Sequence, residues 1–328
     1  MCGRPIVDLS ADPAVEWLLR SSDPSIRYLT LTEVVGRPSA HPSIRSVMTS
    51  IAGGPKVRAL LLGQDDEGGF GVHPYSKWTG GFWRLVALAE LALPSRHPAL
   101  PPLVEHVLKW LEGEKRGTPA VDIRGRVRAH ATQDGYALAA LCRLGLSSHP
   151  SVKTIAHSLV SWQWPDGGWN CDRSPNAAHS SFHETHGPIW GLAEFVRHTK
   201  DREAALSAEK GVEFLLRHGL FRSERTGRVI NPQLLRSRYP PYWHYDVLQG
   251  LWVLSRSDRS DDPRAGEALD ILESKRDGDG RWRAEGYWWK PPGSGGSNVE
   301  VVDWGRRGPN EWVTLRALRV LKSAGRLR

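Results

Sequence analysis

Apolar residues recur at intervals of three and four along most of the chain, which is the spacing that places them on one face of a helix. Val152, Ile155, Leu159 and Trp162 follow this spacing. Similar segments are predicted at Pro13–Arg20, Pro42–Leu62, Leu100–Glu112, Ser151–Trp162, Arg202–Arg217 and Pro263–Lys275. Because each of these segments carries one apolar stripe, we expect each helix to keep its other face in solvent.

A second set of helical segments alternates with the first and is more apolar and richer in small residues. Helices of this composition are packed on several sides, so we expect them to be inner helices. They are predicted at Ser25–Val35, Thr79–Leu93, Thr132–Leu144, Ser181–Arg197, Trp243–Ser255 and Asn310–Ser323. No convincing strand run interrupts the series, so the pattern predicts an all-α protein of six outer–inner helix pairs.

Six successive helix pairs predict an α/α toroid, in which two concentric rings of helices surround a central cavity. Residues 1–328 would form this toroid as a single domain. The inner helices would all begin at one rim and direct the partial positive charge of their N-termini into the cavity, which favours an anionic group there. Three long loops precede inner helices, and such loops are often functional; they are predicted at Pro165–Ser180, Arg222–Pro241 and Asp277–Pro309.

A short turn sequence occurs three times. Gln163–Trp169 reads QWPDGGW, Gln64–Phe70 reads QDDEGGF, and Arg276–Trp282 reads RDGDGRW. Each copy follows one helical segment and precedes an irregular loop and a second helical segment. Repetition of this kind indicates a structural unit that is used again along the fold, so we interpret it as the turn between an outer and an inner helix.

The composition limits the kinds of partner that the protein is expected to bind and indicates its cellular compartment. The chain has 44 Lys+Arg and 36 Asp+Glu, a net charge of +8, which favours an anionic ligand. The basic residues form no Lys/Arg-rich block, so no nucleic-acid partner is expected. No segment approaches the roughly 18 apolar residues of a transmembrane helix, and no signal peptide is expected. Cys2, Cys142 and Cys171 are far apart and odd in number, which indicates no disulfide framework and favours a cytoplasmic protein.

Fifteen tryptophans are the unusual feature of the composition. Several adjoin Gly, Pro or charged residues, which is typical of loops and cavity walls. Aromatic walls suit isoprenoid chains and carbocations through cation–π contacts, and they suit sugar rings equally well. The Gly-rich segment 290–310 lacks the spacing of a phosphate-binding loop and is interpreted as a lid.

The sequence QWPDGGW resembles the QW motif of the squalene–hopene cyclase and oxidosqualene cyclase group, and QDDEGGF resembles a weaker copy of it. The β-subunits of protein prenyltransferases belong to the same superfamily. The resemblance implies an α/α toroid over nearly the whole chain, and an enzyme that acts on an isoprenoid. The Asp-x-Asp-Asp acid motif of class II terpene cyclases is absent, because the nearest string, DRSDD at Asp258–Asp262, has a different spacing.

A metal site is the second implication of the resemblance. The segment YWHYDVLQGL is similar to the one around the zinc-binding His of prenyltransferase β-subunits, which places His244 in the metal position. An Asp and a Cys complete the protein ligands of that family, and here Cys171 with Asp172 or His183 would take that part. Zinc would be the metal, with one coordination position open. The alternative is that these histidines bond to the backbone and that Cys171 is simply packed.

Acidic residues near the starts of inner helices are candidate catalytic groups. They would stabilise a carbocation, bind a cation or act as general acids, or simply interact with helix dipoles. The candidates are Asp134, Asp172, Glu184 and Asp246. Candidate substrate-binding residues are aromatic or basic, and Lys77 among them would meet a diphosphate or carboxylate; they are His73, Lys77, Trp78, Tyr136, His186, Trp243, Trp289, Trp304 and Trp312.

Several functions stay open at this point. The first is a terpenoid cyclase- or prenyltransferase-like enzyme that acts on a small hydrophobic substrate with an anionic head. The second is a zinc-dependent enzyme of another reaction class that uses Cys171, His183 and His244. The third is a non-catalytic toroid that binds a hydrophobic ligand or a partner. A carbohydrate-active toroid would need two carboxylates, for which Asp134 with Asp246 or Glu184 is the available pairing. The sequence leaves the oligomeric state open.

Overall fold

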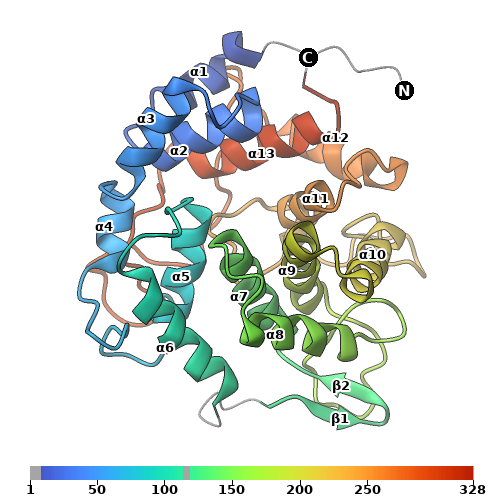
Figure 1. Ribbon diagram of the computed structural model, residues 1–328. Helices are drawn as coiled ribbons and strands as arrows, with labels where there is room; N and C mark the ends of the chain where they lie inside the picture. The colour runs from blue at the N-terminus through green and yellow to red at the C-terminus, as the bar shows by residue number, and fades with distance from the viewer. Residues whose placement is uncertain (1–8, 114–118, 328) are drawn as a thin grey trace.

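Helices form nearly all of the regular structure, which confirms the all-α class. The computed structural model describes residues 9–113 and 119–327 (Figure 1). Cys2 lies outside the described residues. Among the helices of the described residues, none combines the length and the apolar character needed to cross a lipid bilayer.

The predicted first members of the helix pairs form a set that we call the flanking helices. They are α1 (Pro13–Leu19), α3 (Pro42–Ile51), α4 (Pro55–Leu61), α6 (Leu100–Glu112), α8 (Pro150–Ser161), α10 (Arg202–Arg217) and α12 (Gly266–Ser274). The segment expected as one helix over 42–62 is two helices, α3 and α4. Gly53 and Gly54 separate them, and Pro55 begins α4. Glycine disfavours the helix interior and proline is suited to the first helical turn, which explains the break.

The predicted second members form a set that we call the buried helices. They are α2 (Pro24–Leu29), α5 (Gly81–Glu90), α7 (Ala131–Arg143), α9 (Phe182–Thr199), α11 (Val247–Arg256) and α13 (Glu311–Ser323). Residues Ala131 to Cys142 of α7 are all buried, as expected for a helix that is packed on every side. A π-helical segment, η2 (Thr30–Val35), extends α2. The shorter 3-10 turns are η1 (Leu9–Ala11), η4 (Pro232–Leu235) and η5 (Pro263–Ala265).

One small β-hairpin was not anticipated. Strands β1 (Val121–Ile123) and β2 (Arg126–Arg128) pair antiparallel, with Val121 opposite Arg128. Arg124 and Gly125 connect them in the left-handed region, with φ of 56° and 73°, which is the geometry of a tight hairpin turn. Strands of three residues are too short to give a recognisable alternation of apolar and polar positions. The hairpin leads directly into α7.

The repeated turns make equivalent hydrogen bonds. The indole N–H of Trp169 donates to Leu159 O (2.8 Å), and that of Trp282 donates to Leu272 O (2.7 Å), which in both copies lies ten residues earlier on the preceding flanking helix. The Gln163 amide donates to Ser207 O on α10 (2.8 Å), so it ties the turn to the next flanking helix. These hydrogen bonds fasten the turns to flanking helices, whereas the repetition predicted a connection between an outer and an inner helix.

Helices α7 and α9 approach each other closely, because glycine lies where they cross. A side chain on Gly135 would collide with the backbone of Gly187, and one on Gly191 would collide with the backbone of Gly135. The contact therefore depends on the absence of Cβ atoms. It fixes the distance between the helices that carry the pocket described below.

A charged cluster lies at the C-terminal ends of the buried helices. Arg256 Nη2 lies 2.7 Å from Glu194 Oε1, and Arg316 Nη2 lies 2.7 Å from Glu90 Oε1. Arg143 and Arg319 complete the cations, and Glu33 is the third acid. Burial alone would raise the pKa of Glu194, but Arg256 and Arg143 outweigh burial and lower it. Each buried charge is therefore stabilised by partners from other helices.

Replacement of Gly135 by Ala should destabilise the protein by roughly 1–3 kcal/mol, because overpacking forces α7 and α9 apart. Gly278→Ala is the control, since Gly278 is exposed and a Cβ there meets nothing within 4 Å. Urea unfolding of the two variants checks this. Equal stability of both variants would contradict the close-packed crossing.

Replacement of Glu194 by Gln should reduce the free energy of unfolding at pH 7 by about 3–5 kcal/mol, because two buried arginines lose their acid. The lowered pKa of Glu194 means that its contribution is complete above its ordinary pKa of 4.5 and is lost as the pH falls below it. The stability of Glu194→Gln should therefore fall less steeply than that of the wild type on acidification. Glu16→Gln, in an exposed pair with Arg20, should leave unchanged both the free energy of unfolding at pH 7 and its fall on acidification.

Candidate metal centre

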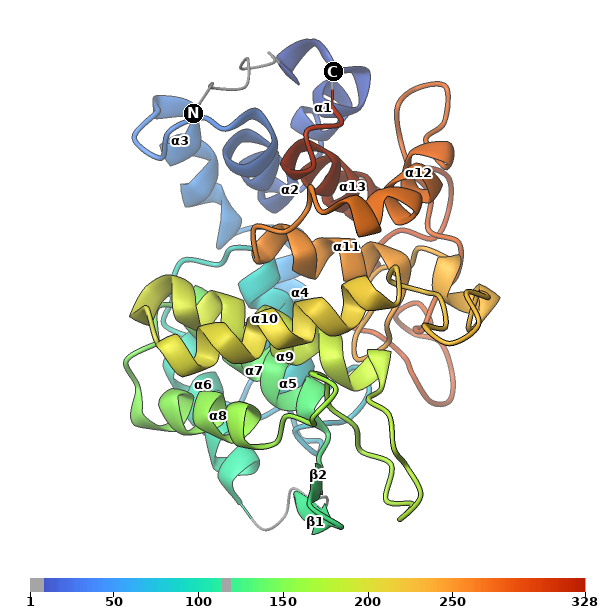
Figure 2. The same cartoon turned by 90° about the vertical axis from the view of Figure 1, so that its right-hand side faces the viewer.

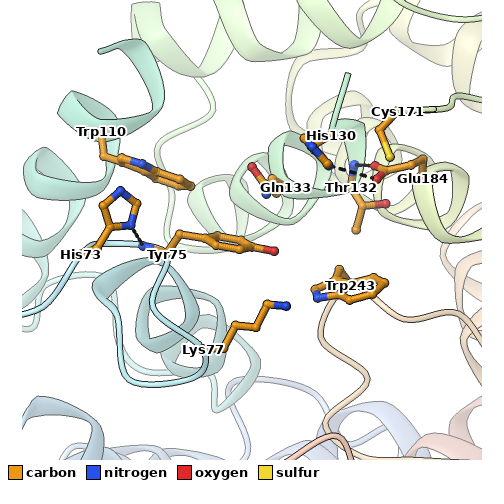
Figure 3. A pocket seen from close by; sticks show the side chains of 10 residues that line it. All are labelled: His73, Tyr75, Lys77, Trp110, His130, Thr132, Gln133, Cys171, Glu184 and Trp243. Atoms are coloured by element: carbon orange, nitrogen blue, oxygen red, sulfur yellow. Dashed lines mark hydrogen bonds and ion pairs between the residues drawn. The ribbon is translucent and has the colours of Figure 1, made fainter. Parts of the chain in front are cut away.

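A pocket of about 400 Å³ opens at the N-terminal ends of α7 and α9 (Figure 3). Its lining comes from the loop before α5, from α6, from the first turns of α7 and α9, and from the segments before α9 and α11. The lining residues are His73, Tyr75, Lys77, Trp110, His130, Thr132, Gln133, Cys171, Glu184 and Trp243. Of the three long loops expected to meet at one rim, only Pro165–Ser180 contributes to this lining, through Cys171.

Three potential metal ligands meet on one side of this pocket. The ligand atoms of His130, Cys171 and Glu184 all lie within 4.8 Å of one another, and no other group of three His, Cys, Asp or Glu within residues 9–113 and 119–327 does so. His130 is the residue before the first turn of α7, and Glu184 lies in the first turn of α9. The backbone N–H of Ala129 donates to Asn170 O (3.1 Å) and thereby joins the segments that carry His130 and Cys171.

The Glu184 carboxylate is held in place by α7. Thr132 N donates to Glu184 Oε2 (2.9 Å), so one oxygen occupies the N-terminal end of the helix, where a negative charge is favoured. Glu184 Oε1 lies 3.5 Å from His130 Nδ1. The first oxygen therefore fixes the orientation of the carboxylate, and the second faces His130 and Cys171.

Burial, together with the Glu184 carboxylate, raises the pKa of the Cys171 thiol to about 12. At neutral pH the thiol is protonated in this environment and is a poor nucleophile on its own. A divalent cation at this point would replace the thiol proton, because a coordinating thiol is deprotonated. The surroundings of Cys171 thus disfavour a metal-free cysteine nucleophile.

The donor set fits zinc. Imidazole nitrogen, thiolate and carboxylate are the three ligand types that zinc takes in proteins. Two ligands with bonds of about 2.0–2.1 Å in tetrahedral geometry are roughly 3.3 Å apart, close to the 3.5 Å between His130 Nδ1 and Glu184 Oε1. Three protein ligands leave one position open toward the pocket.

The structure does not bring the other two predicted ligands into this group. His183 Nδ1 accepts a hydrogen bond from Tyr245 N (2.9 Å). His244 is stacked between Trp243 and Trp288, with ring centroids 3.7 Å apart on each side. Burial lowers the pKa of His244 to about 3, so its imidazole is a neutral layer of an aromatic stack.

The four predicted catalytic acids lie in different environments, and among them only Glu184 lines the pocket. Asp246 is buried as the N-cap of α11 and accepts from Gln249 N and Arg238 N; burial raises its pKa to about 6. Asp134 is buried in the first turn of α7. Asp172 is exposed and accepts from Ser174 N.

The predicted substrate-binding residues divide in the same way. His73, Lys77 and Trp243 line the pocket. The others are buried in the interior; they are Trp78, Tyr136, His186, Trp289, Trp304 and Trp312. In the segment interpreted as a lid, most of residues 290–298 are exposed, whereas Glu300, Val302 and Trp304 are buried.

The tryptophan-rich interior is filled. Two voids there, one beside Trp83 and Trp304 and the other beside Trp190, Trp252 and Trp312, measure only about 20 and 10 Å³. A water molecule needs roughly 10–15 Å³, so each void has room for little more than one. The pocket at the helix N-termini offers far more space for a ligand than these interior voids.

Tyr75 and Trp110 form the wall opposite the metal ligands. Their rings are stacked 5.8 Å apart at an angle of 23°, and Figure 3 shows the Tyr75 hydroxyl directed across the pocket. Burial raises the pKa of Tyr75 to about 12, so its hydroxyl is a hydrogen-bond donor at neutral pH. The lining residues absent from the predicted site residues are Tyr75, Trp110, His130, Thr132 and Gln133. The last two share the helix-start position that selected Asp134, whereas nothing in the sequence distinguishes Trp110.

Comparisons with known proteins give no family. No family model matches the chain, and no curated protein matches its sequence.

Purified protein should bind one zinc ion per chain, and Cys171→Ser or His130→Ala should weaken binding by more than the ~10–100-fold that loss of an outer-shell partner costs. Metal analysis and zinc titration check this. His179→Ala, on the same loop as Cys171 but with an exposed side chain, is the matched control. Loss of zinc in His244→Ala, with retention in His130→Ala, would support the ligand set predicted from the sequence instead.

Proposed function

We propose that this protein is a zinc-dependent enzyme that acts on a small anionic molecule in the pocket at the N-termini of α7 and α9. The observation that carries the proposal is the convergence of His130, Cys171 and Glu184 at the wall of a 400 Å³ pocket. The coordination position that these ligands leave open faces space large enough for a substrate.

The proposal includes the α/α toroid and membership of the cyclase–prenyltransferase superfamily. Three features support the toroid: buried and flanking helices alternate, equivalent turns connect them, and the first helices lie beside the last. Both views place α1 and α2 next to α13 (Figures 1 and 2), as ring closure requires. Superfamily membership rests on the resemblance of Gln163–Trp169 to the QW motif.

Zinc would supply Lewis acidity to polarise a substrate oxygen or to lower the pKa of a bound water or thiol. The residues of this chain would hold and orient it. The hydrogen bond from Thr132 N fixes the Glu184 carboxylate, and such outer-shell contacts set the direction of a ligand. Tyr75 would donate its hydroxyl hydrogen to a substrate oxygen from the opposite wall.

Charge favours an anionic substrate. The thiolate of Cys171 and the carboxylate of Glu184 would neutralise a divalent cation, which leaves Lys77 as an uncompensated positive charge at the pocket. Its ammonium lies 5.3 Å from the Trp243 ring centroid, and no carboxylate of the described residues lies within ion-pair distance of it. A phosphate or carboxylate would complete this site.

An isoprenoid diphosphate is the substrate that the resemblance favours, and the aromatic walls of Tyr75, Trp110 and Trp243 suit its chain. The filled interior argues against cyclisation of a large polyene at the centre of the molecule. A binding protein without catalysis is the remaining alternative, and it is an outcome of the experiment below.

Incubation of the zinc-loaded protein with aryl phosphates, aryl carboxylate esters and prenyl diphosphates, followed by mass spectrometry, tests the proposal. We expect turnover of at least one class, lost on chelation and in Cys171→Ser. Turnover that survives chelation would exclude zinc chemistry. Tight binding with no product would identify a binding protein.

Lys77→Met should raise the Kd for phenyl phosphate about tenfold, which corresponds to ~1.4 kcal/mol, because the anion loses its cation. Calorimetric titration measures this. Lys290→Met, at an exposed position away from the pocket lining, should bind like the wild type. An unchanged Kd in Lys77→Met would contradict the assigned role of the ammonium.

A further inference from the structure

The guanidinium of Arg128 is buried next to the metal ligands and is not paired with an acid. Arg128 is only 1% exposed, and no carboxylate of the described residues lies within ion-pair distance of it. Its Nη2 donates to Ala177 O (3.1 Å) and, more weakly, to Ser174 O (3.4 Å). Its Nε and Nη1 have no hydrogen-bond partner in the described structure. Burial of a cation with free hydrogen-bond donors costs free energy of folding, so the contacts that Arg128 does make must offset this cost.

The carbonyls that Arg128 contacts belong to a loop that begins at the metal site. Asn170 Nδ2 donates to His179 O (2.8 Å) and closes residues 170–179 into a compact Ω-shaped loop. Cys171 is the second residue of this loop. At the far end, Ser180 N and Ser180 Oγ donate to the Asp166 carboxylate at 2.8 and 2.6 Å. Both ends of the loop are thus fixed to the body of the protein.

Arg128 also lies between the two segments that carry metal ligands. Its backbone forms a parallel bridge with Asn170, the residue before Cys171, and His130 follows two residues after Arg128. The guanidinium stacks on the Trp164 ring, with its central carbon 4.2 Å from the ring centroid. This contact supports the side chain that donates to the carbonyls of the loop. One residue thereby contacts the loop of Cys171 and the strand that leads to His130.

We propose that Arg128 is a positioning residue, which holds the loop 170–179 so that the Cys171 thiolate reaches a metal bound by His130 and Glu184. This inference rests on the proposed function. The hydrogen bonds to Ser174 O and Ala177 O direct these carbonyls inward, and the guanidinium fills the space that they enclose. Arg128→Met keeps much of the apolar volume but removes both hydrogen bonds. The loop and its Cys171 then lose their fixed conformation, while His130 and Glu184 keep their positions.

Cobalt(II) binding tests this directly, because a cobalt–thiolate bond gives a charge-transfer absorption that imidazole and carboxylate ligands do not. The wild type should show this band, and Cys171→Ser should not. Arg128→Met should lose most of the band and bind cobalt(II) about 10–100-fold more weakly, as expected for loss of an outer-shell partner. A general loss of stability would not remove the thiolate band selectively in a folded protein.

Arg124→Met is the matched control, because Arg124 Nη1 reaches Pro175 O of the same loop at 3.5 Å but is exposed. It should keep the band and the affinity. A wild-type band and affinity in Arg128→Met would overturn the positioning role and leave the metal site intact. Absence of cobalt(II) binding by the wild type would overturn the metal site, and the positioning role with it.

Asn170→Asp covers the case in which Arg128→Met does not fold. Asp keeps the oxygen that accepts from Asp172 N (2.9 Å) but cannot donate to His179 O, so it releases the same loop from a half-buried position. We expect a weakened thiolate band with an unchanged circular dichroism spectrum. A full wild-type band in this variant would show that the loop path does not set the ligation by Cys171.

Discussion

The glutamates of the charged cluster at the C-terminal ends of the buried helices are each paired with a cation, and these pairs join helices that are distant in sequence. Glu33 and Glu194 both face Arg256, and Glu90 faces Arg316. The arginines lie near the C-terminal ends of their helices or on α13, and a helix C-terminus itself favours positive charge. Because an unpaired buried charge is strongly destabilising, these pairs favour the arrangement in which α5, α9, α11 and α13 bring their charged residues together. Packed tryptophans leave only small voids in the interior that their abundance suggested was hollow.

The opposite ends of the same helices are free to form a site. There the backbone N–H groups of first turns need acceptors, and Glu184 supplies one to Thr132. The carboxylate that satisfies the end of α7 is also the one that faces His130 and Cys171. One side chain therefore serves both the helix terminus and the candidate metal centre, which places the chemistry at a position that the fold itself makes rigid.

The helices were predictable because periodicity is a local property, and nearly every expected segment is a helix within a few residues of its predicted bounds. Cys171 was expected as a zinc ligand from the resemblance and Glu184 as a catalytic acid at the start of an inner helix, and both line the pocket. The pairing of Cys171 with His130 was not expected, because it depends on a bridge between Arg128 and Asn170 that no spacing encodes. His244 was chosen by resemblance, whereas the structure makes it a layer between Trp243 and Trp288. Some of the ion pairs in the charged cluster likewise join residues more than two hundred positions apart, such as Glu90 with Arg316 and Glu33 with Arg319.

The order of synthesis on the ribosome determines when these distant ion pairs can form. The acids Glu33 and Glu90 are made early, but their partners Arg319 and Arg316 lie on α13 and are made more than two hundred residues later. Long-range contacts of this kind slow folding, and domains of this size are synthesised over many seconds. Until α13 has left the exit tunnel, Glu90 lacks Arg316 and Glu33 lacks Arg319. These two ion pairs therefore form only after α1 to α12 have been made.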